Sequence, residues 1–267
     1  MVDRRMTIWC GGTGPFLIAV LVLLAACGTS SETGWSSARR QIRPGTARQE
    51  ASAVAPVRRT VPLGESVQGR SITAVEVGDP HAARRVLVVG CVHGDEPAGV
   101  PVAQALAASP EPSGADLWVV PVLNPDGMAA RTRGNAHGVD LNRNFPAGWR
   151  RMDAPGSVHY SGAGPLSEPE SGFAAGLIRR IRPTVAIWFH QHLAVVDGSE
   201  GPKDVERRFA RDVGLPVRTL TDYPGSATGW ENTVVRDSAF VVELPAGRLP
   251  AQAVRRYADA VRRITGP

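Results

Sequence analysis

Lysine is almost missing from this chain of 267 residues, because Lys203 is the only lysine among its 30 basic residues. Nearly all of the positive charge is therefore arginine, spread along the chain with no basic stripe interleaved with aromatic residues, which make up only 6% of the sequence. A nucleic-acid-binding surface needs such a clustered basic patch. We therefore expect no nucleic-acid partner, although the formal net charge is +5.

Cysteine is also scarce, with only Cys10, Cys27 and Cys91 in the whole chain. If the first two belong to an export signal, Cys91 stays alone in the mature protein, and no disulfide can form within it. Cys91 follows an apolar run that is typical of a buried strand. We expect it to be a small core residue and not a metal ligand.

The longest apolar run, Phe16–Leu24, is too short to span a bilayer comfortably as a permanent helix. An arginine pair precedes it, and the run leads into Leu-Ala-Ala-Cys ending at Cys27, which resembles a bacterial lipobox. We expect residues 1–27 to be a signal peptide and Cys27 to carry lipid. The protein would then be an exported, membrane-anchored lipoprotein on the outer face of the cytoplasmic membrane. An ordinary signal peptide cut nearby and an uncleaved anchor are the alternatives.

Residues 28–55 are rich in Ser, Thr, Gly, Ala and Arg and show no apolar periodicity, so we expect a flexible linker there. The folded domain is expected at residues 56–267, where short β-rich runs alternate with helical patterns. This alternation predicts an α/β fold with a buried, mainly parallel sheet. The predicted strands cover residues 85–92, 117–122, 184–189 and 239–244. The predicted helices cover residues 97–108, 204–213 and 250–264, and a further helix is capped by Ser167 with Glu170 and stops before Pro183. A turn is expected at Asn124–Gly127.

Three candidate functional residues, His93, His190 and Glu243, stand at or just past the ends of predicted strands. Ligands collect at the carboxyl edge of the strands in open α/β sheets, so these side chains are expected to converge. His93 and Glu96 are three residues apart in a loop and could hold two sides of a zinc ion, with His190 as the third ligand. An exposed loop pair is the alternative for His93 and Glu96.

Glu243 lies within an apolar strand, where a carboxylate is costly unless it has a partner. This placement favours a functional acid. A structural ion pair with an arginine is the alternative.

A long phrase at residues 124–146, NPDGMAARTRGNAHGVDLNRNFP, follows the HGDE of residues 93–96. Four further phrases come after it in order: SEPES, WFHQH, YPGSATGW and VVELP. Together they resemble the zinc carboxypeptidase family that includes carboxypeptidase A, and most of all its short bacterial murein peptide amidases. The resemblance covers nearly all of residues 56–267. It implies a three-layer α/β/α sandwich around a mixed, mainly parallel twisted sheet.

The resemblance also implies a role for each matching residue. His93, Glu96 and His190 would bind one zinc ion, and Asp140 would orient a ligand imidazole. Glu243 would be the general base that deprotonates water and passes the proton to the leaving amine.

The substrate would be held by four further residues. Arg133 would stabilise the oxyanion, and it is preferred over Arg131 because it matches the family's TRxN phrase. Asn142 and Arg143 would receive the substrate's terminal carboxylate, and Tyr223 would close over it.

The remaining histidines match no motif of their own. We expect His192 to line the pocket, and His81, His137 and His159 to be surface residues.

The resulting expectation is a zinc-dependent metallocarboxypeptidase or amidase that cleaves peptides, plausibly the γ-D-glutamyl-diaminopimelate bond of murein. The alternatives are an acylamino-acid deacylase of the succinylglutamate desuccinylase and aspartoacylase type, and a non-catalytic cell-wall-binding descendant.

Overall fold

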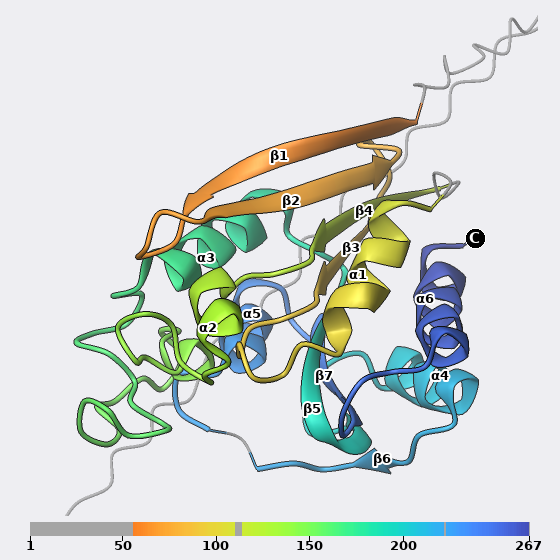
Figure 1. Cartoon of the computed structure of the whole chain (residues 1–267). Helices are drawn as coiled ribbons and strands as arrows, with labels where there is room; N and C mark the ends of the chain where they lie inside the picture. The colour runs from red at the N-terminus through yellow and green to blue at the C-terminus, as the bar shows by residue number, and fades with distance from the viewer. Residues whose placement is uncertain (1–55, 110–113, 222, 267) are drawn as a thin grey trace, which may run out of the picture. The chain divides into compact units, whose positions relative to one another are not determined.

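A computed structural model describes residues 56–109, 114–221 and 223–266 (Figure 1). The expected signal peptide at 1–27, its Cys27 and the expected linker at 28–55 lie outside the described residues. Within the described ranges, none of the helices combines the length and the apolar character needed to cross a bilayer.

One sheet of seven strands forms the middle of the domain, in the order β1-β2-β4-β3-β5-β6, with β7 paired to β5. The strands are β1 (Val57–Glu65), β2 (Ser71–Gly78), β3 (Arg84–Val89), β4 (Ala115–Val120), β5 (Val185–Asp197), β6 (Val217–Arg218) and β7 (Ala239–Pro245). The pairs β3·β4, β3·β5, β5·β6 and β5·β7 are parallel, and β1·β2 and β2·β4 are antiparallel. The expected mixed, mainly parallel sheet is confirmed.

Helices cover both faces of the sheet (Figure 1). They are α1 (Gly99–Ala107), α2 (Pro125–Ala130), the 3₁₀ turn η1 (Leu141–Arg143), α3 (Pro169–Ile181), α4 (Lys203–Val213), α5 (Ala227–Val234) and α6 (Ala251–Thr265). One apolar core joins α1, α4 and α6 to the sheet, and a second joins α3 and α5 to its other face. Because both faces are covered, the inner strands are apolar almost throughout, and every residue of β4 is buried.

Several local expectations differ from the structure. The expected turn at Asn124–Gly127 is the start of α2: Asn124 caps the helix by accepting a hydrogen bond from the Gly127 amide, and Pro125 occupies the first turn, where it is tolerated.

The expected capping box is wrong. The residue before α3 is Glu168, not Ser167, and its side chain does not cap the helix. The carboxylate of Glu170 accepts hydrogen bonds from Asn135 and from the Val67 amide instead.

The strands β1 and β2 were not predicted. β1 lies at the edge of the sheet and is largely exposed or half-buried, so its sequence lacks a clear apolar alternation.

Candidate active site

Three side chains from two distant segments of the sequence meet past the carboxyl end of β3 and beside the middle of β5. His93 Nδ1 is 3.0 Å from Glu96 Oε1, His190 Nδ1 is 3.0 Å from Glu96 Oε2, and the two Nδ1 atoms are 3.2 Å apart. Both imidazoles are buried, and Glu96 is nearly so. The expected convergence of these three side chains is therefore present in the structure.

The donor set fits a zinc ion. Nitrogen and oxygen ligands about 2.0–2.1 Å from a tetrahedral zinc ion lie about 3.4 Å from one another, close to the spacing of these three groups. His93 Nε2 is 2.9 Å from Asp140 Oδ1, which assigns the ring proton to Nε2 and leaves the Nδ1 lone pair facing His190. Two imidazole nitrogens and a carboxylate around one point, with one nitrogen kept unprotonated, suit a cation.

Asp140 connects the parts of the site. Its carboxylate is fully buried and accepts hydrogen bonds from Arg133 Nε and the Asn142 amide, both at 2.9 Å, in addition to its contact with His93. His159 Nδ1 lies 3.4 Å from the same carboxylate. Asp140 thus orients a candidate ligand, as the resemblance implied, and also fixes the residues expected to bind substrate.

The electrostatics of the site favour a bound cation. Burial raises the pKa of Glu96, but hydrogen bonds and charge from His190 and His93 outweigh it and hold the pKa well below its usual range. Burial likewise raises the pKa of Asp140, and charge from His93, Arg133 and Arg143 more than reverses it. Burial lowers the pKa of His93, yet the two carboxylates raise it overall. Two buried carboxylates therefore stay anionic at neutral pH.

Glu243 lies beside the candidate metal ligands. The register of β5 and β7 pairs His190 with Glu243, and β5 then folds back so that Val195 is also paired with Glu243. Directly paired residues on neighbouring strands point to the same face of a sheet. The Glu243 carboxylate lines the same cleft as His93, Glu96 and His190, and its Oε2 lies 3.4 Å from the Leu193 amide.

The two arginines of the TRxN region are placed differently. Arg133 lines the cleft, and its Nη1 donates to Glu96 Oε1 at 2.9 Å while its Nε donates to Asp140. Arg131 is exposed, ends α2 in the left-handed conformation, and does not line the cleft. Neither contact of Arg133 uses Nη2, which remains on the guanidinium as a further donor.

The expected carboxylate-binding residues also line the cleft, which has a volume of about 380 Å³. Asn142 Oδ1 accepts from the Ala227 amide at 2.8 Å, so its amide group is oriented by the start of α5. The guanidinium of Arg143 is buried, with its central carbon 4.2 Å from the centre of the Tyr223 ring. Tyr223 is 44% exposed and forms part of the outer wall.

The other histidines lie where they were expected. His192 lines the cleft, and His81 is exposed. His159 is a surface residue as expected, with 47% of its side chain exposed, but it also lines the cleft and contacts Asp140. His137 is largely exposed but pairs with Glu168 at 2.7 Å.

Cys91 is buried as expected, and its thiol donates to the His93 carbonyl. Burial raises the pKa of this thiol to about 12, and Cys91 is not among the side chains that meet at the candidate metal site.

Sequence reasoning missed two acidic side chains of the cleft, Asp197 and Glu200. Both follow from the length of β5, which was expected to end at Phe189 but continues to Asp197. The apolar Val195-Val196 pair before Asp197 is the one signal that could have indicated the longer strand.

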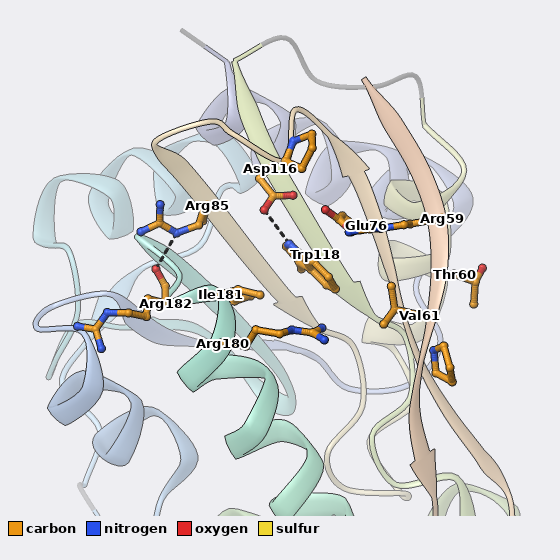
Figure 2. A pocket seen from close by; sticks show the side chains of 12 residues that line it. Arg59, Thr60, Val61, Glu76, Arg85, Asp116, Trp118, Arg180, Ile181 and Arg182 are labelled. Atoms are coloured by element: carbon orange, nitrogen blue, oxygen red, sulfur yellow. Dashed lines mark hydrogen bonds and ion pairs between the residues drawn. The ribbon is translucent and has the colours of Figure 1, made fainter. Parts of the chain in front are cut away.

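A second pocket, of about 640 Å³, lies at the opposite edge of the sheet, where β3 and β4 begin (Figure 2). Its acidic groups already have partners in the fold: Arg59 pairs with Glu76, and Trp118 Nε1 donates to Asp116 at 2.8 Å. Arg85 donates to the Arg182 carbonyl. This pocket is separate from the metal centre, and its contacts are structural.

Comparison with known proteins adds independent information. The profile of the zinc carboxypeptidase family matches residues 113–196. Murein peptide amidase A of Escherichia coli (strain K12) is 34% identical over 188 residues, which cover 63% of this chain and 76% of that protein. The gamma-D-glutamyl-L-diamino acid endopeptidase 1 of Lysinibacillus sphaericus is 25% identical over 250 residues, covering 73% and 62%.

Solved structures give the same picture. The murein-tripeptide amidase from Escherichia coli O157 superposes with a TM-score of 0.65 at 28% identity, covering 82% of this chain and 96% of that one. Carboxypeptidase A from Helicoverpa armigera has a TM-score of 0.68 at 20% identity, with 78% and 68% covered, and supports the fold.

Proposed function

This chain belongs to the zinc carboxypeptidase family and is a peptide hydrolase, and from this premise we propose that it cleaves the bond between γ-D-glutamyl and a diamino acid in murein peptides. The observation that carries the hydrolase mechanism is the compact group of His93, Glu96 and His190 beside Glu243. The murein substrate is supported by the similarity to murein peptide amidase A over three quarters of that protein.

His93, Glu96 and His190 would hold one zinc ion, which when bound supplies a Lewis acid for the scissile carbonyl and for the attacking water. Glu243 takes a proton from that water and delivers it to the nitrogen of the departing residue. The position of this carboxylate, in the cleft and on the strand next to His190, supports both proton transfers.

Different residues of the cleft contact different groups of the substrate. Arg133 is held at one wall by Glu96 and Asp140, and its Nη2 donates to the oxygen that becomes negative as water adds to the carbonyl. Asn142 and Arg143 receive the carboxylate of the departing residue. Tyr223 covers the guanidinium of Arg143 and closes this end of the cleft.

The decisive experiment compares two substrates with the zinc-loaded full-length chain. We expect release of diaminopimelate from L-Ala-γ-D-Glu-diaminopimelate, and loss of this activity after chelation with recovery on adding zinc. Ordinary α-linked peptides are the control substrate. Cleavage of the α-linked peptides alone would overturn the murein assignment while leaving the hydrolase class intact.

We propose also that lipid on Cys27 keeps the enzyme at the outer face of the cytoplasmic membrane, where murein peptides occur. The lipobox-like sequence ending at Cys27 supports this proposal. Metabolic labelling with a fatty acid is expected to mark the wild-type protein and not Cys27→Ser. Equal labelling of both would contradict a lipid on this residue.

A further inference from the structure

Two carboxylates that the proposed mechanism does not use line the active-site cleft. Asp197 ends β5, Glu200 follows in the next loop, and both side chains are half-buried and line the cleft with His190 and Glu243. After His190, β5 folds back along β7 and ends at Asp197, and Glu200 follows in the next loop. One continuous segment of the chain therefore supplies a candidate metal ligand and both carboxylates.

Both carboxylates are held in place by neutral groups. Asp197 accepts hydrogen bonds from the Ser199 amide at 2.9 Å, the Ser199 hydroxyl at 2.8 Å and the Leu220 amide at 3.1 Å. Glu200 accepts from Asn232 Nδ2 at 3.0 Å. Asn232 is itself fixed by the backbone at Ser238 and Ala239. The two charges are therefore rigidly positioned and are not neutralised by these contacts.

No arginine or lysine in the described ranges forms an ion pair with either carboxylate. The nearest basic contact in this loop is Lys203, whose ammonium donates to the Gly198 carbonyl at 3.0 Å and lies 3.6 Å from Glu206. Glu206 is buried behind the loop. Two anionic side chains thus face the cleft without a basic protein partner of their own.

The same cleft also contains positive groups. Arg133 and Arg143 line it together with Asn142, and Asn142 and Arg143 are expected to receive the substrate's carboxylate. A departing residue held there by its α-carboxylate would extend its side chain into the rest of the cleft. Two carboxylates without a basic protein partner are complementary to a positive group on that side chain.

On the basis of the proposed function, we propose that Asp197 and Glu200 are specificity-determining residues that select a departing residue whose side chain carries an ammonium group. Lysine and diaminopimelate both have this ammonium group, since one amine of each lies in the scissile bond and the second is on the last carbon of the side chain; in diaminopimelate that carbon also carries a carboxylate, whereas lysine has the ammonium group alone. A departing residue with only an acidic side chain would be repelled by the same two carboxylates. An apolar departing residue would leave both carboxylates without a charged partner.

The test uses four substrates that differ in one group or one linkage. The first pair is L-Ala-γ-D-Glu-L-Lys and the same peptide with norleucine, whose side chain has the same four carbons as that of lysine but no ammonium group. The second pair is an α-linked peptide ending in lysine or in norleucine. For the zinc-loaded full-length protein we expect kcat/KM for lysine to exceed that for norleucine by about 100-fold, because a hydrogen bond to a charged group is worth about 1.5–3 kcal/mol.

Asp197→Asn and Glu200→Gln preserve the size and most hydrogen bonds of each side chain while removing its charge. Each is expected to reduce the lysine-to-norleucine ratio about tenfold or more. The control is Glu65→Gln, an exposed residue at the end of β1, which should keep the wild-type ratio.

A wild-type ratio near one, or an unchanged ratio in both variants, would overturn the proposed selection. Cleavage of only the α-linked pair would instead contradict the murein function, and the ratio within that pair would then decide the role of Asp197 and Glu200.

Discussion

His190 and Glu243 occupy paired positions on neighbouring parallel strands, so a candidate metal ligand and the proposed base are positioned by one section of the sheet. Neighbouring strands lie about 4.8 Å apart, and paired side chains share a face. The spacing between His190 and Glu243 is therefore set by the pairing of β5 with β7 and does not depend on a flexible loop.

Replacing Glu243 by glutamine should abolish the proton transfer while leaving the metal in place. We expect Glu243→Gln to lower kcat by about 10²–10⁴-fold, the usual contribution of a general base. Zinc content measured by atomic absorption should match that of the wild type. Activity close to the wild-type value in the zinc-loaded variant would rule out this role for Glu243.

Asp140→Asn should weaken the metal centre without touching a ligand. The variant loses the negative charge that holds the His93 ring proton on Nε2, and such changes typically cost 10–100-fold in metal affinity. Competition with a chromophoric chelator measures this affinity. Asp204→Asn is a suitable control, since its carboxylate is 97% exposed. Equal zinc affinity in the two variants would contradict the orienting role of Asp140.

Glu231 should make the protein less stable as the pH rises. It is fully buried, Trp188 Nε1 donates to its Oε2 at 2.8 Å, and its Oε1 has no partner among the described residues. Burial raises its pKa from 4.5 to about 8. The folded protein then keeps a proton that the unfolded chain has released. The contribution of Glu231 to the free energy of unfolding is greatest below pH 4.5 and falls as the pH rises towards about 8.

The expected slope from this one proton is roughly 1.4 kcal/mol per pH unit within that window. Urea unfolding at several pH values should show a flatter dependence for Glu231→Gln than for the wild type. Some slope should remain, because burial also raises the pKa of Glu206, to about 7. Identical slopes for wild type and Glu231→Gln would show that Glu231 does not hold a proton in the folded state.

Gly94→Ala should disturb the metal loop. A Cβ atom at Gly94 would lie 1.9 Å from the Gly127 carbonyl carbon in α2, a contact between two backbones that no rotamer change relieves. We expect a loss of about 1–3 kcal/mol of stability or more, together with reduced zinc binding.

Gly176→Ala is the matched control, because that position in α3 is exposed and its Cβ would meet nothing within 4 Å. Alanine there should be neutral or slightly stabilising, since it favours a helix over glycine. Thermal unfolding and zinc content check both variants, and equal behaviour would contradict the close approach of the loop and α2.

The central strands and the candidate metal ligands could be predicted from the sequence because local signals were strong there. The apolar runs before His93 and His190 are long enough to indicate buried strands, and the ordered motifs indicated the candidate ligands. The edge strand β1 lacked such signals, because its side chains are exposed or only partly buried. β2 is an inner strand whose first half alternates buried with exposed or half-buried residues, a pattern that was not recognised.

The second half of β5 was missed for another reason. The strand continues through His192 and Leu193, which are exposed, and then folds back along β7. No local pattern encodes that change of direction, because it depends on the pairing partner. Two other features depend on contacts between segments distant in sequence and became visible only in three dimensions. These are the placement of Asp197 and Glu200 in the cleft and the contact of His159 with Asp140.

The position of Asp140 also limits how the site can change. One buried carboxylate contacts a candidate metal ligand, the guanidinium of Arg133 and the backbone of Asn142. Substitutions among His93, Arg133 and Asn142 should therefore have non-additive effects in double-mutant cycles. A variant with altered substrate preference is more readily obtained at Asp197 and Glu200, whose supporting hydrogen bonds do not include Asp140.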